Sequence, residues 1–349
     1  MLYCSLTYKQ VILLLHIQIK GGNPWRMGSP KVDGLPYFRE HLVKHLNQDE
    51  NGSFLFNEKI GDADSRPLNT PYALTSYAYV HKNALFITLD AFHQVFADGQ
   101  LYFNKELSSG GEGMITCTVT GDHLAWFENV LKEANKDASI KHIFVQAHVP
   151  ILQPVRKIFC SGQFFDEAKE SEFWKMMQKY GVDVYFAGEV HANTATKDDS
   201  TDLIQVVSRG NSINNFISVD VNEDKFTLSS YNEVGPDWRW NGNYTKYGEI
   251  IVDKSGESTS IESSGSLKIL DIKSGPLIEF SFEEGDMYPF DTRQIIGLMH
   301  NQYKQSLIGK DITIRNQISS TGMENYGSFG RKYYCMIRYY FLRFFSNLI

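Results

Sequence analysis

A helical repeat of apolar residues followed by a short apolar run is the first readable pattern in this chain. Residues 120–134 place their apolar side chains on one helical face, with Thr120 or Asp122 available as the N-cap. The run 142–147 has the length and the apolar content of a buried strand, and it ends at His148. The pattern therefore predicts a helix, then a strand, then a histidine at the strand end.

The same order recurs immediately downstream. Residues 166–180 predict a second helix, which Gly181 ends, and residues 182–187 predict a second buried strand followed by Glu189 and His191. Strands that are joined through a helix run parallel, so both polar turns are expected at the same sheet edge. Ligands of open α/β sheets bind outside the carboxyl ends of the strands.

The helical pattern disappears after about residue 200, and short strand-like runs alternate with polar turns. The first three runs are expected to follow one another as successive strands, and the last three to form a small β accessory region. These runs occupy residues 203–207, 216–221, 225–231, 248–253, 266–272 and 277–282.

Three side chains at the two strand ends are candidate metal ligands. His148 alone is also consistent with an ordinary histidine before a Val-Pro turn, and polar residues such as Glu189 and His191 are common in turns. Because imidazole and carboxylate groups from both turns are expected to converge, the combination favours a metal site over three unrelated turn residues.

The order of these motifs resembles a known family. A strand, Ala-His148-Val-Pro, a helix, a strand and Gly-Glu189-Val-His191 resemble the last two metal motifs of the calcineurin-like metallophosphoesterases, which are Gly-His and Gly-His-x-His. Residues 85–90 resemble the family's middle strand, and the resemblance covers roughly residues 20–235. It implies an α/β fold of the two-sheet αββα sandwich type, with the later strands 203–231 in the second sheet.

The resemblance also implies which ion each ligand binds. His148 and Glu189 would hold one divalent metal ion, and His191 would hold its neighbour. Glu189 stands where the family has a histidine, and a carboxylate remains a competent ligand for Mn, Fe or Zn while favouring harder ions. The alternative is that Glu189 only forms a hydrogen bond with His191 or with a neighbouring backbone amide.

The family's earlier motifs match less well. The chain contains no Asp-x-His, and its Gly-Asp-Ala-Asp at 61–64 comes after the candidate third motif. In that third motif Asn23 matches a metal-binding asparagine, although Gly-Gly-Asn-Pro is also an ordinary turn sequence. Pro24 replaces a histidine that would stabilise or protonate the departing oxygen. Arg26 and His93 are alternative donors that the sequence does not distinguish.

The missing motifs favour a chain that begins late, with residues 11–19 as an internal strand instead of a signal peptide. We divide the chain into an incomplete calcineurin-like phosphoesterase domain (1–235), a β-rich accessory region (236–330) and an aromatic, basic tail (331–349). The tail is expected to be a packed segment or an aberrant C-terminal sequence, and the alternative is a helix that lies at a membrane interface. No transmembrane span is predicted.

Composition narrows the class of partner. The chain has 349 residues, 42% of them hydrophobic, and a net charge of −7, which argues against a nucleic-acid surface. Its four cysteines have no metal-ligand spacing; buried thiols are expected, and Cys117 and Cys160 would pair only in an exported protein. Asn51 and Asn243 lie in N-glycosylation sequons, which arise easily by chance. The expected protein is soluble, and its compartment stays open between cytoplasmic and secreted.

The resemblance implies hydrolysis of a small-molecule phosphoester by metal-activated water, with divalent metal ions (Mn, Fe or Zn) as cofactors. The set Asn23, His148, Glu189 and His191 lacks the bridging carboxylate, so one weakly held metal ion is expected in place of a pair. The alternative is an inactive binding or scaffold protein with the same fold.

Overall fold

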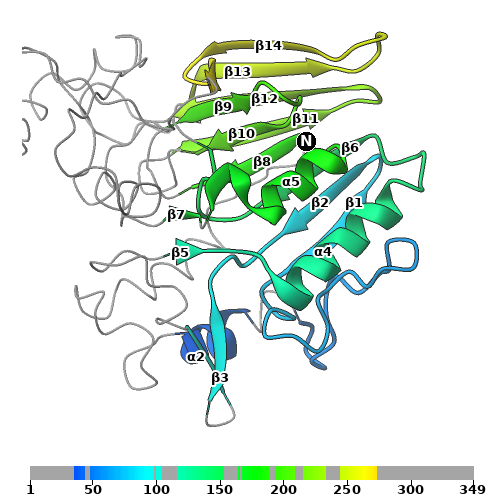
Figure 1. Cartoon of the computed structure of the whole chain (residues 1–349), viewed down its shortest axis with the longest axis vertical. Coiled ribbons are helices and arrows are strands. Elements are labelled where there is room, and N and C mark those ends of the chain that lie inside the picture. The colour runs from blue at the N-terminus through cyan, green and yellow to red at the C-terminus, as the bar shows by residue number, and fades with distance from the viewer. Residues whose placement is uncertain are drawn as a thin grey trace, which may run out of the picture.

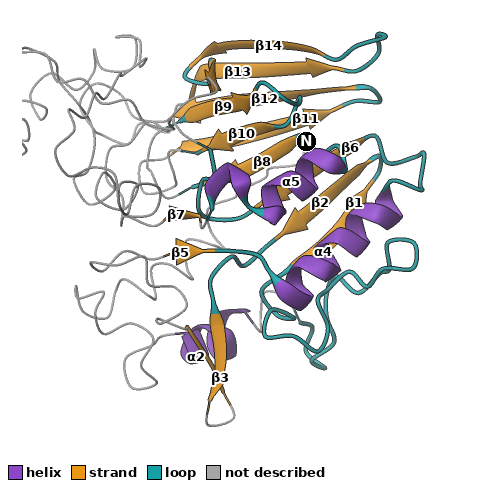
Figure 2. Cartoon of the chain, in the orientation of Figure 1, coloured by secondary structure: helices purple, strands orange, loops and turns teal. Residues whose placement is uncertain are grey.

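The computed structural model describes residues 35–43, 48–97, 100–103, 116–152, 164–165, 167–188, 193–208, 215–232 and 244–272. These residues form an α/β fold in which helices cover one face of a large sheet and a smaller sheet covers its other face (Figures 1 and 2). The two main helices are α4 (Gly121–Ala134) and α5 (Glu172–Lys179).

The large sheet has seven strands in the order β1-β2-β6-β8-β10-β9-β15. Four neighbours, β2, β6, β8 and β10, run parallel, whereas β1 pairs antiparallel with β2 and β9 pairs antiparallel with β10. Parallel strands with both faces covered are expected to be predominantly apolar, and these strands are, apart from Thr88, His142, Gln146 and Gln205. The strands are β1 (Tyr77–His81), β2 (Ala84–Thr88), β6 (His142–Gln146), β8 (Val184–Ala187), β9 (Thr194–Asp198), β10 (Ile204–Val207) and β15 (Ile269–Ile272).

The smaller sheet is an antiparallel meander of four strands. Its alternate side chains Ile217, Val219, Phe226 and Leu228 pack against the large sheet, in a core that includes Phe144. This alternation is the signature of a sheet with one buried face. The strands are β11 (Asn215–Val221), β12 (Lys225–Asn232), β13 (Thr245–Asp253) and β14 (Ser260–Gly265).

A second core lies between the helices and the large sheet. Phe127 and Leu131 of α4 and Phe173 of α5 are buried there with Val145 and Tyr185 of the strands. Ser171 caps α5 by accepting a hydrogen bond from the Trp174 backbone amide at 3.2 Å. Thr120 occupies the N-cap position of α4 in an extended conformation without a side-chain cap hydrogen bond.

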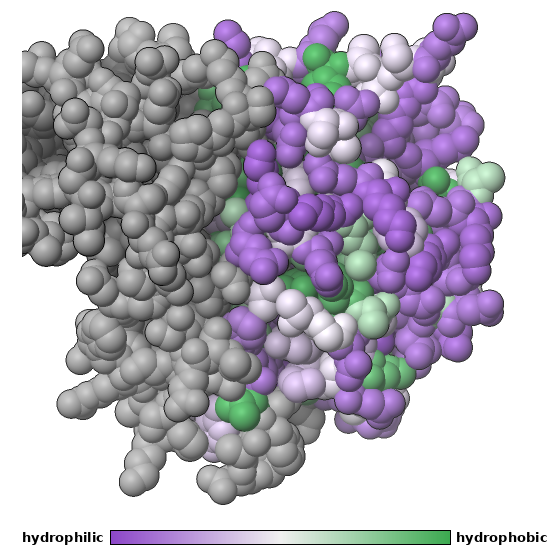
Figure 3. Space-filling model, viewed as in Figure 1, coloured by the Kyte–Doolittle hydropathy of each residue, from purple (hydrophilic) through white to green (hydrophobic). Residues whose placement is uncertain are grey.

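The remaining described elements are short. They are α2 (Leu35–Phe38), a π-helical turn η2 (Arg39–Val43), β3 (Gln94–Ala97), β4 (Gln100–Phe103), β5 (Thr116–Cys117), β7 (Phe164–Phe165) and the 3-10 turn η3 (Ala168–Glu170). Within the described part of the chain, no helix is long and apolar enough to cross a bilayer. In the view of Figure 3 the described surface is mostly hydrophilic, with small apolar spots.

The structure confirms the order of the two predicted helix–strand pairs and the parallel pairing of β6 with β8. The second helix is shorter than the predicted 166–180, because α5 begins at Glu172 after the separate 3-10 turn η3. It corrects the placement of residues 203–207: β10 lies in the large sheet beside β8, because the intervening chain forms an additional strand, β9, that the pattern did not predict. Residues 245–272, within the predicted accessory region, add strands to both sheets. The predicted strands 11–19 and 277–282 and the tail lie outside the described residues.

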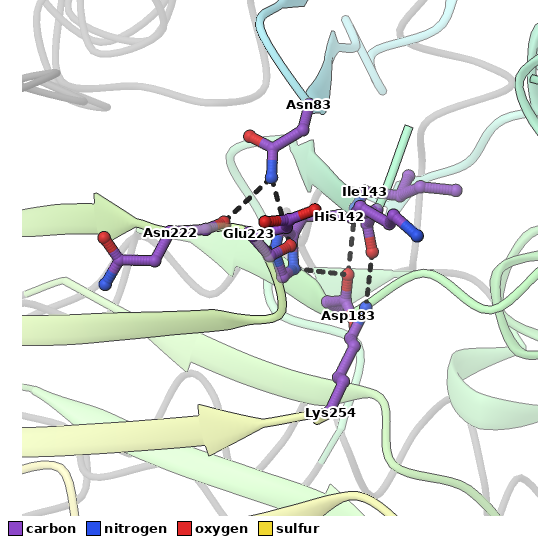
Figure 4. A network of polar contacts seen from close by, with 8 residues as sticks. Asn83, His142, Ile143, Asp183, Asn222, Glu223 and Lys254 are labelled. Atoms are coloured by element: carbon purple, nitrogen blue, oxygen red, sulfur yellow. Dashed lines mark hydrogen bonds and ion pairs between the residues drawn. The ribbon is translucent and has the colours of Figure 1, made fainter. Parts of the chain in front are cut away.

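A polar network joins the two sheets at the amino ends of β6 and β8 (Figure 4). Lys254 Nζ lies 2.6 Å from Asp183 Oδ1 and donates to the Lys141 carbonyl oxygen at 2.8 Å. The His142 ring nitrogen Nε2 lies 3.1 Å from the carbonyl oxygen of Glu223, in the turn between β11 and β12. A carbonyl oxygen only accepts, so Nε2 is the donor in this bond. Burial lowers the pKa of His142. Asn83 donates to the same turn.

Candidate functional site

The carboxyl ends of β2, β6, β8 and β10 lie side by side at one edge of the large sheet (Figure 1). Backbone hydrogen bonds continue past the strand ends: Leu89 N donates to Gln146 O at 2.9 Å, and Ala147 N donates to Phe186 O at 3.1 Å. The last described polar residue of the edge is Ser208, whose amide donates to the Ala187 oxygen at 3.0 Å. The polar turns after these strands therefore start from adjacent positions.

His148 is the predicted ligand that the structure describes, and it lies at this edge. Its side chain is largely buried, and its ring stacks with that of Phe92 at a centroid distance of 6.5 Å. The Gly188 amide donates to the His148 carbonyl oxygen at 2.8 Å. A Cβ atom on Gly188 would lie 3.3 Å from His148 Nδ1, so the imidazole occupies the space that a side chain at position 188 would need.

The other predicted ligands, Asn23, Glu189 and His191, lie outside the described residues. Their positions relative to His148 therefore stay predictions. Within the described ranges there is no group of three or more His, Cys, Asp and Glu side chains that could hold a metal ion. What the structure brings together is His148 and Gly188, the residue that begins the Glu-Val-His turn.

Asp90 is a buried acid at the same edge that the sequence reasoning did not select as a site residue. Its Oδ1 accepts the Phe92 amide at 3.1 Å, and its Oδ2 accepts Gln94 Nε2 at 2.5 Å. Burial raises the pKa of Asp90 to about 6, against the opposing effect of these hydrogen bonds and of Arg39. Both carboxylate oxygens are engaged by protein donors, so Asp90 organises the turn after β2. The available signal was an acid ending an otherwise apolar strand.

Arg39 reaches this turn from the π-helical segment η2. Its Nη1 donates to the Pro71 carbonyl oxygen at 3.1 Å and to Gln94 Oε1 at 3.3 Å, so Gln94 bridges Arg39 and Asp90. Burial lowers the pKa of Arg39, whereas the nearby Asp90 charge raises it. These hydrogen bonds fix the loop after β2, which carries Phe92, and the Phe92 ring stacks with the His148 ring.

A second buried polar network lies where β10 ends and β11 begins. Ser208 Oγ donates to Asn215 Oδ1 at 3.1 Å, and Asn215 Nδ2 donates to the Tyr231 carbonyl oxygen at 2.8 Å. Asn193, two residues after the predicted ligand His191, donates to Ser230 Oγ at 2.6 Å. The chain that leaves the Glu-Val-His turn is therefore anchored to the smaller sheet by a buried amide.

Comparison with known proteins adds little to this geometry. No protein-family model matches the chain, and no curated protein matches it. Among solved structures, one match is described as GAP50, the anchor in the inner membrane complex of Plasmodium, at 12% sequence identity and a TM-score of 0.27. The alignment covers 57% of this chain and 63% of that chain, so this chain spans less than two thirds of that chain's length.

Proposed function

We propose that the chain is a metal-dependent phosphoesterase-like hydrolase whose metal site lies at the carboxyl edge of the large sheet. The fold we propose is the two-sheet αββα sandwich of the metallophosphoesterases. The observation that carries the proposal is the contact between His148 and Gly188, because it sets an imidazole against the start of the Gly-Glu-Val-His turn. Imidazole and carboxylate groups together suit Mn, Fe or Zn.

In this proposal His148 and Glu189 hold one ion, and His191 and Asn23 complete the ligand set. The metal supplies an activated water and charge stabilisation at phosphorus. The protein's own contribution is to hold the backbone that carries the imidazole: the Gly188 amide donates to the His148 carbonyl, and the Phe92 ring stacks on one side of the imidazole. The substrate is a small-molecule phosphoester.

A non-catalytic binding module with the same fold is the second candidate. It is favoured by the engagement of both Asp90 oxygens with protein donors, which leaves the buried acid of this edge committed to its own turn. It is also favoured by Pro24, which cannot donate a proton to a departing oxygen. The two candidates share the metal site and differ in turnover.

Binding of Mn²⁺ to the full chain tests the site, with the electron paramagnetic resonance signal of free Mn²⁺ as the readout. The site variants are His148→Ala, Glu189→Ala and His191→Ala, and the matched control is His81→Ala, at the exposed end of β1. We expect all three site variants to lose binding and the control to retain it. Unchanged binding in the three site variants would overturn the proposal.

Hydrolysis of an aryl phosphate in the presence of Mn²⁺ then decides between the two candidates. Turnover that His148→Ala abolishes and His81→Ala preserves supports the hydrolase. Metal binding that depends on His148 without any turnover supports the binding module.

A further inference from the structure

Two buried side chains from neighbouring strands hold the chain segment that follows His148. Tyr185 of β8 and Gln205 of β10 are direct partners across these parallel strands, so both side chains leave the same face of the sheet. Neither residue has any solvent exposure. The Tyr185 hydroxyl donates to the carbonyl oxygen of Val149, the residue after His148, at 2.7 Å.

Gln205 binds the next part of the same segment with both ends of its amide. Its Oε1 accepts the backbone amides of Ile151 at 2.6 Å and Leu152 at 2.8 Å. Its Nε2 donates to the Leu152 carbonyl oxygen at 3.1 Å. Glutamine is suited to this role because its amide carries an acceptor and two donors.

A glutamine in this position needs an explanation, because β10 is otherwise apolar and fully buried. Burying an amide costs free energy unless it forms hydrogen bonds, and a Leu or Ile would pack in the same layer without that requirement. All three hydrogen bonds of Gln205 are made with the segment that follows His148 in the chain, and the neighbouring Tyr185 forms a hydrogen bond with that segment too.

We infer that Gln205 and Tyr185 are positioning residues for His148 as a metal ligand. The His148 carbonyl oxygen itself accepts a hydrogen bond from the Gly188 amide at 2.8 Å. The Tyr185 and Gln205 side chains hold the segment that follows it, residues 149–152. With the backbone fixed on both sides, the position from which the His148 side chain extends is set before a metal arrives. The inference rests on the proposed function.

Removing either support should weaken metal binding without removing the ligand. We expect Gln205→Leu to raise the Mn²⁺ dissociation constant about 10- to 100-fold, the range typical of groups that orient metal ligands. Tyr185→Phe removes one hydroxyl and should raise it roughly two- to tenfold. The matched control is Tyr180→Phe, which removes a tyrosine hydroxyl that donates to Glu128 Oε1 at 2.8 Å, in the helix layer.

Gln205→Glu gives a readout that a purely structural role would not produce. Its carboxylate accepts the Ile151 and Leu152 amides, but it donates to the Leu152 carbonyl only when protonated. The ratio of the Mn²⁺ dissociation constants of Gln205→Glu and the wild type should therefore fall as the pH is lowered. For Tyr180→Phe the same ratio should stay near one throughout.

Wild-type Mn²⁺ affinity in a folded Gln205→Leu protein would overturn the inference. Where that variant does not fold, Tyr185→Phe decides, since it keeps the ring and its packing. If His148→Ala weakens Mn²⁺ binding but neither positioning variant does, only the positioning role fails. If His148→Ala itself has no effect, the proposed function fails, and the inference fails with it.

Discussion

Gly188 and His148 contact each other closely across the ends of two parallel strands. The Gly188 amide donates to the His148 carbonyl oxygen at 2.8 Å, and a Cβ on Gly188 would lie 3.3 Å from Nδ1 and 3.4 Å from Cε1 of the imidazole. A glycine at this position thus permits the close approach of the ring to the neighbouring strand end. The contact links the two turns on which the proposed metal site depends.

Gly188→Ala should therefore displace the His148 ring by a few tenths of an ångström. We expect the Mn²⁺ dissociation constant to rise by about tenfold, as when the groups that orient a ligand are altered. Stability should fall by about 1 kcal/mol, at the low end for a methyl group added to a packed site, because the neighbouring His148 side chain can shift. The control is Gly256→Ala, where the added Cβ would meet Ser258 O at 3.4 Å, an ordinary contact. Equal Mn²⁺ affinity in both variants would contradict the prediction.

Asp90 should make stability depend on pH. Burial raises its pKa in the folded protein from 3.8 to about 6, so the folded state binds the proton more tightly than the unfolded state. Its contribution is fully present below pH 3.8 and is lost as the pH rises through about 6. The loss is on the order of 3 kcal/mol. Urea unfolding of the wild type and Asp90→Asn at both ends of this window measures it; parallel pH profiles would refute it.

His123 should make stability depend on pH in the opposite direction. Its ring lies between Tyr72 and Trp126, and neither ring nitrogen has a hydrogen-bond partner among the described residues. Burial lowers its pKa from 6.5 to about 3. Its neutral ring must be kept in the folded state, so stability is lost as the pH falls below 6.5. His123→Phe keeps a ring for stacking and should remove this loss, up to about 1.4 kcal/mol per pH unit.

The measurement for His123→Phe is the midpoint of thermal unfolding as a function of pH, compared with His81→Phe at the exposed end of β1. The advantage of His123→Phe over the wild type should grow as the pH falls. An advantage that is independent of pH would mean that packing, and not protonation, accounts for the change.

Lys254 should stabilise the junction of the two sheets through Asp183. The two groups are 2.6 Å apart, and their side chains are 26% and 10% exposed. Lys254→Met leaves the Asp183 carboxylate without its cation and should cost roughly 2 kcal/mol, less than for a fully buried pair because Lys254 contacts water. Combining it with Asp183→Asn should cost less than the two single changes together. Additive losses, measured by urea unfolding, would show that the pair is not coupled.

The matched control for Lys254→Met is Lys175→Met. Lys175 Nζ lies 3.0 Å from Glu170 Oε2, but both side chains are more than half exposed. Solvent screens such a pair, so this variant should show little measurable loss. A loss equal to that of Lys254→Met would indicate that burial of the pair at the sheet junction is unimportant.

The sequence by itself determined the elements that carry His148 and the Glu-Val-His turn. Helical periodicity in residues 120–134 and 166–180, each followed by an apolar run, was sufficient because burial on both faces makes such strands continuously hydrophobic. Parallel pairing of the two strands followed from the helical connections. Local pattern and the geometry of connections are properties of the chain alone.

Only the tertiary structure decided which sheet each later strand joins. Residues 204–207 were expected in the second sheet, yet they lie beside β8, and the polar strand β9 intervenes in the chain. The hydrogen bonds of Gln205 could not be predicted from the sequence either, because its partners Ile151 and Leu152 lie 54 and 53 residues earlier in the chain. A periodic pattern reports which face of an element is buried, whereas hydrogen-bond partners are set by long-range packing.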